Sequence, residues 1–266
     1  MENKFKYQDV DISYQVYGKG QPVVLLHGFA EDSTIWNEQV SFLQEHCLLI
    51  LPDLPGSGKS PMLQKPEVGM EDYADCIKAL IDHERVAECI LLGHSMGGYV
   101  TLAFAEKYGD SLKGWGFIHS TASADNEEKK SARKKGISLI EKYGTYPFLK
   151  NSTPNLFSDN FKKQHPEKIE ALIEQGKNFT KEALIQYYTA MMNRPERTLE
   201  LKKTKVPVLF IIGSEDVAAP LKDLLNQVHV PKVSHIHLMN GIGHMSMIEA
   251  PGELNKYLMQ FIKSAE

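Results

Sequence analysis

The sequence predicts an α/β fold in which helices cover both faces of a mostly parallel sheet. Four short runs are continuously apolar, as strands buried on both faces of a parallel sheet must be. Gly or Pro follows each run, and helical patterns lie between them, so strand and helix alternate along the chain. The four runs are Pro22–Leu26, Leu48–Leu51, Cys89–Leu92 and Val206–Ile212.

The remaining elements of the predicted sheet follow from weaker patterns. Two alternating segments, Phe5–Gln8 and Ile12–Tyr17, predict an antiparallel hairpin at one edge of the sheet. Two later segments, Gly114–His119 and His235–Met239, predict further strands. The helices expected around the sheet are Trp36–Gln44, Tyr73–Asp82, Met96–Tyr108 and Pro251–Lys263.

The alternation stops between residues 121 and 201, where only helices are expected. This predicts a helical cap inserted at 121–201 into an α/β core formed by 1–120 and 202–266. Thr180 precedes the last inserted helix and is a good N-cap residue. The expected helices are Glu127–Tyr143, Pro166–Gln175 and Lys181–Asn193. The same stretch holds aromatic residues that form either a small core or the wall of a pocket: Tyr146, Phe148, Phe157, Phe161 and Phe179.

Composition and charge exclude several classes of protein. With 266 residues, 42% hydrophobic and 24% charged, the chain is neither collagen-like, disulfide-scaffolded nor disordered. Its 30 Lys+Arg against 34 Asp+Glu lack the basic excess of nucleic-acid binding, so no nucleic-acid partner is expected. The cysteines Cys47, Cys76 and Cys89 form no C-x-x-C motif and indicate buried, reduced thiols. With no signal-peptide pattern and no membrane-spanning run, we expect a cytoplasmic protein, its oligomeric state open.

The strongest chemical signal is Gly93-His94-Ser95-Met96-Gly97, a G-x-S-x-G pattern between a predicted buried strand and a predicted helix. That setting forces the serine into a strained turn and brings the residues two positions either side close together, so only glycine fits there. Ser95 is then exposed at the sheet edge, beside the amides of a helix N-terminus. The pattern predicts Ser95 as a nucleophile.

A nucleophilic serine needs a histidine base oriented by a carboxylate. Among 10 histidines, His244 follows the last predicted strand on a Gly-rich loop and is the best placed. Structural roles are expected for the others, and His235-x-His237 lacks a third ligand for zinc. Asp216 follows the preceding strand and is the expected carboxylate. Glu215 is a fallback and Asp125 a rival, although Asp125-x-x-Glu128 also matches a helix capping box.

Attack on a carbonyl also needs two amides that hold the oxyanion. Met96 supplies one, directly after the nucleophile. Phe29, on the loop His27-Gly28-Phe29-Ala30 after the first buried strand, is expected to supply the other. The segment from Asp53 to Ser60 imitates a phosphate-binding loop, but it lacks the first glycine, and Pro61 stands where a helix should begin.

Together, these motifs resemble the α/β-hydrolase superfamily over nearly the whole chain. The matching segments, in the family's order, are His27-Gly28-Phe29, Asp53 to Ser60, Gly93 to Gly98, Gly213-Ser214-Glu215-Asp216 and Gly243-His244. The resemblance implies an eight-stranded, mostly parallel sheet, a helical cap over the active site, and no cofactor. Since the histidine spacing shows no zinc motif, no metal is expected either. It casts doubt on dehalogenation and epoxide opening, because those members use an aspartate nucleophile where this chain has Ser95.

We therefore expect a serine hydrolase that cleaves a small or medium carboxylic ester through an acyl-enzyme, with a small-molecule acyl substrate as its partner. Thioester, amide, lactone or C–C bond hydrolysis and perhydrolysis at the same site stay open, as does a ligand-binding sensor with negligible turnover. Specificity depends on the pocket walls, which the shared motifs do not determine.

Overall fold

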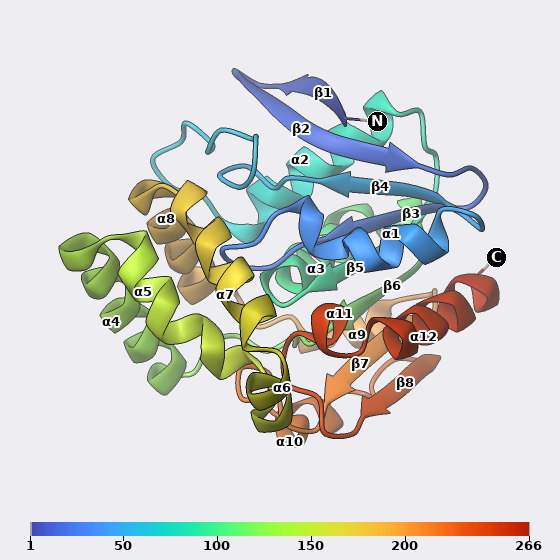
Figure 1. Ribbon diagram of the computed structural model, residues 1–266. Coiled ribbons are helices and arrows are strands. Elements are labelled where there is room, and N and C mark those ends of the chain that lie inside the picture. Colours follow the sequence, from blue (N-terminus) through green and yellow to red (C-terminus); the bar gives the residue numbers. More distant parts are fainter. Residues whose placement is uncertain (1, 266) are drawn as a thin grey trace.

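The computed structural model describes residues 2–265 and contains one eight-stranded sheet flanked by helices (Figure 1). The strand order is β1-β2-β4-β3-β5-β6-β7-β8. The β1–β2 and β2–β4 pairs are antiparallel, and the other five strand pairs are parallel. This confirms the predicted fold class and the edge hairpin. The strands are β1 Glu2–Tyr7, β2 Val10–Tyr17, β3 Pro22–Leu26, β4 Leu48–Pro52, β5 Cys89–His94, β6 Leu112–Ile118, β7 Val208–Gly213 and β8 Ser234–Met239.

The central strands are apolar because both of their faces are covered. In β3, Val24 and Leu26 belong to a core with helices α2 and α3, whereas Val23 and Leu25 belong to a second core with α1 and α12. Side chains alternate between the two faces of a strand, so a continuous apolar run supplies both cores. The helices of the core are η1 Ser33–Trp36, α1 Asn37–Leu43, α2 Met70–His83, α3 Met96–Tyr108, η2 Gly109–Ser111, α10 Leu221–Leu225, α11 Ser246–Glu249 and α12 Pro251–Ser264.

Between β6 and β7 the chain forms only helices, which we call the helical insertion. In Figure 1, α4, α5, α7 and α8 lie together at the left of the view, whereas α9 lies near β7. They are α4 Glu127–Tyr143, α5 Thr145–Ser152, η3 Thr153–Leu156, α6 Asp159–Gln164, α7 Pro166–Gln175, η4 Gly176–Asn178, α8 Lys181–Asn193 and α9 Thr198–Lys203. The predicted ranges of α4, α7 and α8 match, and Thr180 caps α8 by accepting a hydrogen bond from the Ala183 amide. The domain boundaries at 121 and 201 stay a prediction.

The helical insertion has no core of its own. Phe179 joins the core on the α2 and α3 face, whereas Phe157 and Phe161 stack on each other and join the core on the other face. Tyr187 reaches the α/β core directly, since its hydroxyl lies 2.7 Å from the Ser57 hydroxyl and donates to the Pro55 carbonyl at 2.8 Å. The insertion is therefore anchored through both faces of the sheet.

The capping box predicted at Asp125 is wrong. The N-cap of α4 is Asn126, whose side chain accepts a hydrogen bond from the Lys129 amide. Asp125 is buried instead and forms ion pairs with Arg133 and Arg194. An asparagine caps a helix as well as an aspartate, which leaves the charged Asp125 available for the two arginines.

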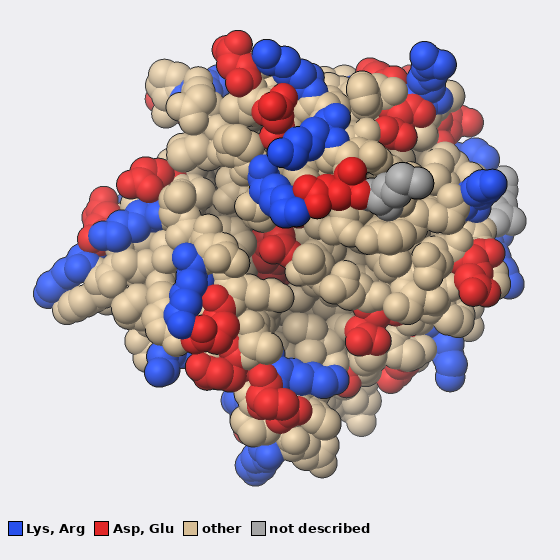
Figure 2. Space-filling model, turned by 45° about the horizontal axis from the view of Figure 1, so that its top comes forward, with Lys and Arg blue, Asp and Glu red and all other residues tan. Residues whose placement is uncertain are grey.

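The surface agrees with the nearly balanced composition. Figure 2 shows Lys and Arg interspersed with Asp and Glu on the face in view, without a region of one sign. All three cysteine side chains are buried, as predicted. Among the helices of residues 2–265, none combines the length and the apolar character that crossing a bilayer requires.

Candidate active site

Ser95 occupies the sharp turn between β5 and α3, with φ 50° and ψ −113°. A non-glycine residue rarely adopts positive φ, and such strain collects at functional sites. Hydrogen bonds hold the turn: the Ser95 amide donates to the Ile118 carbonyl at 3.0 Å, and the Ser120 hydroxyl donates to the Ser95 carbonyl at 2.7 Å. Those bonds fix the backbone and leave the Ser95 hydroxyl available for chemistry.

The two glycines of the motif are required by close backbone approach. A Cβ on Gly93 would lie 2.2 Å from the carbonyl carbon of Gly97, and one on Gly97 would lie 2.6 Å from the Leu26 and His27 carbonyl oxygens. Real Cβ atoms do not come this close to backbone. The sequence argument for glycine on either side of Ser95 is therefore consistent with the geometry of the turn.

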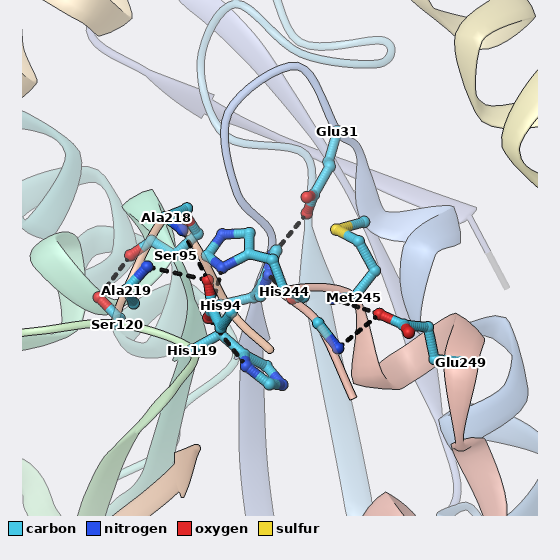
Figure 3. A network of polar contacts seen from close by, with 12 residues as sticks. Glu31, His94, Ser95, His119, Ser120, Ala218, Ala219, His244, Met245 and Glu249 are labelled. Atoms are coloured by element: carbon cyan, nitrogen blue, oxygen red, sulfur yellow. Dashed lines mark hydrogen bonds and ion pairs between the residues drawn. The ribbon is translucent and has the colours of Figure 1, made fainter. Parts of the chain in front are cut away.

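His244 and Asp216 are in direct contact. Nδ1 of His244 lies 2.8 Å from Oδ2 of Asp216 and donates to it. The other carboxylate oxygen, Oδ1, accepts from the amides of Ala218 and Ala219 at 2.8 and 2.9 Å (Figure 3). The neighbouring Glu215 side chain is exposed, so it is not the partner of this histidine. Asp216 is thus held rigidly beneath the imidazole.

Ser95 and His244 meet at one cavity of about 160 Å³ near the carboxyl ends of the strands. Its lining also includes Phe29, Glu31, Tyr99, His119, Arg133, Leu156, Tyr188, Met191, Ala218 and Ala219. No hydrogen bond joins the Ser95 hydroxyl to His244 within the described residues. Such contacts in free enzymes are often long and tighten when substrate binds.

The electrostatics of the pair match its geometry. Burial raises the pKa of Asp216, but His244 and His119 outweigh this and hold the pKa of that carboxyl far below its usual range. Burial lowers the pKa of His244, but the Asp216 carboxylate outweighs it, so this pKa lies above its ordinary value. An ionised Asp216 therefore stabilises the imidazolium that forms when His244 takes a proton.

His119 is a member of the site for which the sequence predicted only a structural role. Its Nδ1 lies 3.1 Å from the same Asp216 oxygen that contacts His244, and burial lowers the pKa of His119 to about 4. The neutral ring therefore donates from Nδ1 and leaves Nε2 as a buried acceptor that has no partner within the described residues. Only its position at the end of a strand could have indicated this role.

His119, Asp216 and His244 also form the one group in the described part of the chain that could hold a metal ion, with ligand atoms within 4.8 Å of one another. Both ring nitrogens that face Asp216 share hydrogen bonds with one of its oxygens. These two hydrogen bonds between imidazole nitrogens and a carboxylate oxygen explain why the three side chains lie so close together.

Two further histidines position the surrounding loops. Nε2 of His27 accepts from the Leu54 amide at 2.9 Å. His94 connects the Glu31 carboxylate, 2.9 Å from Nδ1, with the carbonyl of His244, 3.0 Å from Nε2 (Figure 3). Burial raises the pKa of Glu31, but His94 and the Gly28 amide outweigh this and hold it below its usual value. His94 therefore joins the loop after β3 to the loop that carries His244.

The two expected oxyanion donors flank Ser95. Met96 is the first residue of α3, where backbone amides have no partner within the helix. Phe29 lies on the loop after β3 and lines the cavity. This loop is held in shape because the Gly28 amide donates to Glu31 at 2.7 Å. Neither the Phe29 nor the Met96 amide donates to another residue in the hydrogen bonds of the described chain.

The segment resembling a phosphate loop is a structural turn. Asp53 accepts hydrogen bonds from the amides of Ser33 and Lys59, both at 3.0 Å. A Cβ on Gly58 would lie 2.3 Å from the Asp53 carboxylate, and the next helix begins only at Met70. The segment thus packs around its own aspartate.

The chain is similar to known proteins in its sequence and in its fold. Residues 21–126 match the family model described as alpha/beta hydrolase fold. A curated 3-oxoadipate enol-lactonase from Acinetobacter baylyi is 23% identical over 255 residues, which are 93% of this chain and 91% of that protein. Lipase 1 of Psychrobacter immobilis is 26% identical over 247 residues, which are 88% of this chain and 74% of the lipase.

Solved structures agree with the sequence relatives. A thermophilic esterase from Thermogutta terrifontis superposes with a TM-score of 0.93 at 27% identity, covering 100% of this chain and 99% of the esterase. The enol-lactonase from Burkholderia xenovorans shares the fold, with a TM-score of 0.90 at 20% identity over 98% of this chain and 100% of that one. The family-model match over residues 21–126 and the superposition with the esterase over the whole chain show that this chain has the α/β-hydrolase fold, and the relatives are named as enzymes.

Proposed function

We propose that this enzyme is a serine hydrolase that cleaves small or medium carboxylic esters through an acyl-enzyme intermediate. The observation that carries the proposal is the hydrogen bond between His244 and the buried Asp216, beside a cavity that Ser95 shares with His244. A serine hydroxyl becomes nucleophilic when a neighbouring histidine accepts its proton, and the carboxylate holds the ring in the required tautomer.

The proposed reaction uses each group in turn. The Ser95 hydroxyl attacks the ester carbonyl while Nε2 of His244 takes its proton, and the amides of Phe29 and Met96 hold the oxyanion. The protonated His244 gives its proton to the leaving alcohol as the C–O bond breaks. Water then attacks the acyl-enzyme with His244 again as the base, which releases the carboxylic acid and restores Ser95.

Relatives and cavity size support an ester of modest size. Two enol-lactonases, a lipase and an esterase among the relatives and structural neighbours are named for the hydrolysis of carboxylic esters, alongside relatives named as a carbamate hydrolase and as hydrolases of 2-hydroxy-6-oxo-dienoates. The cavity of about 160 Å³ adjoins a second pocket of about 100 Å³, and the two share Phe29, Glu31, Leu156 and Tyr188. A short acyl chain fits such a space, whereas a long lipid chain exceeds it.

The test is to replace Ser95 with alanine. Ser95→Ala should abolish fluorophosphonate labelling and lower the rate of 4-nitrophenyl butyrate hydrolysis by about 10⁴-fold or more, with unchanged circular dichroism. Ser41→Ala is the matched control, because this exposed serine of α1 does not line the cavity, and it should keep the labelling. Labelling that persists in Ser95→Ala would refute the proposal.

A further inference from the structure

Two arginines of the helical insertion share one buried carboxylate at the wall of the catalytic cavity. Arg133 on α4 donates to Asp125 through Nε at 2.6 Å and through one terminal nitrogen at 3.3 Å. Nη1 of Arg194, directly after α8, lies 2.8 Å from Oδ1 of the same carboxylate, the oxygen that the terminal nitrogen of Arg133 also contacts. Burial raises the pKa of Asp125, but both arginines outweigh it and hold the pKa below its usual value. The group therefore carries one net positive charge.

The two arginines differ in how their donors are used. Arg194 has a side chain only 3% exposed, and its terminal nitrogens donate to the Met191 and Ser123 carbonyls. Its guanidinium also lies 3.8 Å from the centre of the Tyr99 ring, so both terminal nitrogens of Arg194 are engaged with the protein, and only the buried Nε has no partner within the described residues. It acts as a brace between the insertion and the core.

Arg133 is engaged on one side only. Two of its five N–H groups face Asp125, and no other hydrogen bond within the described residues uses the remaining three. Its side chain is 18% exposed and lines the cavity that contains Ser95 and His244. Its guanidinium lies 5.5 Å from the centre of the Tyr188 ring, which helps to fix its position.

The acidic groups near Ser95 do not use these donors. Glu31 accepts from the Gly28 amide and contacts His94, and Asp216 accepts from Ala218, Ala219 and the two histidines. A guanidinium with unused N–H groups beside a nucleophile is suited to a carboxylate, which it binds through charge-assisted and often bidentate hydrogen bonds.

We propose that Arg133 forms a carboxylate subsite, so that the preferred substrates are short esters whose acyl or alcohol half carries a carboxylate. The inference rests on the proposed serine esterase function and adds its substrate class. Ser95 and Arg133 line the same cavity of about 160 Å³, so a short spacer is expected between the ester carbonyl at Ser95 and a carboxylate at Arg133.

The experiment compares charged and neutral esters of matched length by measuring acid release. Monomethyl glutarate against methyl pentanoate tests the acyl half, and 4-acetoxybutanoate against butyl acetate tests the alcohol half. The wild-type enzyme should prefer the charged member of at least one pair. Arg133→Met should lower kcat/KM for that charged ester by about tenfold or more and change the neutral ester by less than about twofold.

Lys134→Met is the matched control, because it removes one positive charge from the exposed face of the same helix. In both ester pairs, Lys134→Met should leave the ratio of kcat/KM for the charged ester to kcat/KM for the neutral ester unchanged. This result separates direct binding from general attraction of anions. Arg133→Lys keeps the charge without the planar fork and should give an intermediate preference. Glutarate should also inhibit hydrolysis of 4-nitrophenyl acetate, with a higher inhibition constant in Arg133→Lys and Arg133→Met than in the wild type.

Two outcomes would overturn the subsite. One is an equal loss of activity toward charged and neutral esters in Arg133→Met, which would make Arg133 a brace like Arg194. The other is a wild-type preference for the neutral member of both pairs. Failure of the proposed function itself looks different, because Ser95 would then neither react with a fluorophosphonate nor turn over any of the four esters.

Discussion

The carboxyl edge of the sheet and the helical insertion contribute to the same cavity in different ways. The sheet edge holds its reactive groups through backbone contacts: the Ser95 turn is fixed by the Ile118 carbonyl, and Asp216 by the amides of Ala218 and Ala219. The insertion contributes side chains, among them Arg133, Tyr188 and Met191, whose positions depend on how its helices pack. Under the proposed function, the edge carries the reacting groups, and the insertion supplies the part of the cavity wall that selects the substrate.

The largest effect should come from the sheet edge. Asp216→Asn removes the charge that stabilises the His244 imidazolium and disturbs the tautomer of that ring, so kcat should fall by about 10⁴-fold for charged and neutral esters alike. Glu215→Gln is the control, because this neighbouring carboxylate is exposed and should be silent. Steady-state kinetics on both ester classes measure the effect. A loss confined to one ester class would contradict the division of roles.

Acidification should remove activity before it removes the fold. The pKa of His244 lies above its ordinary value. As the pH is lowered, kcat/KM should therefore begin to fall while the pH is still above about 6.5, and then drop about tenfold for each further pH unit. The raised pKa of His244 stabilises the folded state at pH values below the ordinary histidine pKa, and this contribution is lost as the pH rises through the folded-state pKa.

His119 has the opposite effect on stability. Its pKa is lowered to about 4, so between about pH 6.5 and 4 the unfolded chain takes up a proton that the folded chain does not, which favours unfolding. The two histidines oppose each other in this window. We expect urea unfolding to show a modest change of stability where activity is already lost, and global unfolding that coincides with the loss of activity would contradict this.

The smallest effect should come from the wall of the insertion. The Tyr188 ring stacks on Phe29 at 4.2 Å between ring centres and packs edge-on against Phe148. Tyr188→Leu should raise KM by about tenfold or less and leave kcat nearly unchanged, because the lost contacts bind substrate without touching the reacting atoms. Tyr143→Leu, at a tyrosine 56% exposed on the same insertion, should have no effect. A large fall in kcat in Tyr188→Leu would show that the wall takes part in the reaction.

Much of the fold could be predicted because its strands carry their own signal. The central strands are buried on both faces, so their apolar runs are visible without knowledge of their neighbours. The short helices α5, α6, α9, α10 and α11 went unpredicted, since helices of 4 to 8 residues offer too few turns for a periodic pattern.

The candidate site likewise contains residues that the sequence could predict and residues that it could not. Ser95, Asp216 and His244 follow the strands β5, β7 and β8, so chain order alone indicated where they should meet, and their catalytic roles stay a proposal. Arg133 stands in a run of charged residues that reads as a solvated helix face, and nothing in the run distinguishes it from Lys134 or Lys135. Its place in the cavity depends on the packing of α4 against α8.

The sequence by itself determined the alternating α/β architecture and the need for glycines around Ser95. Both are visible within short segments, because a strand buried on both faces must be apolar and a close approach of backbone leaves no room for a Cβ. The tertiary structure alone decided that His119 shares Asp216 with His244, and that one of two similar arginines keeps donors toward the cavity. Such contacts join residues far apart along the chain, and their geometry exists only once the helices and strands have packed.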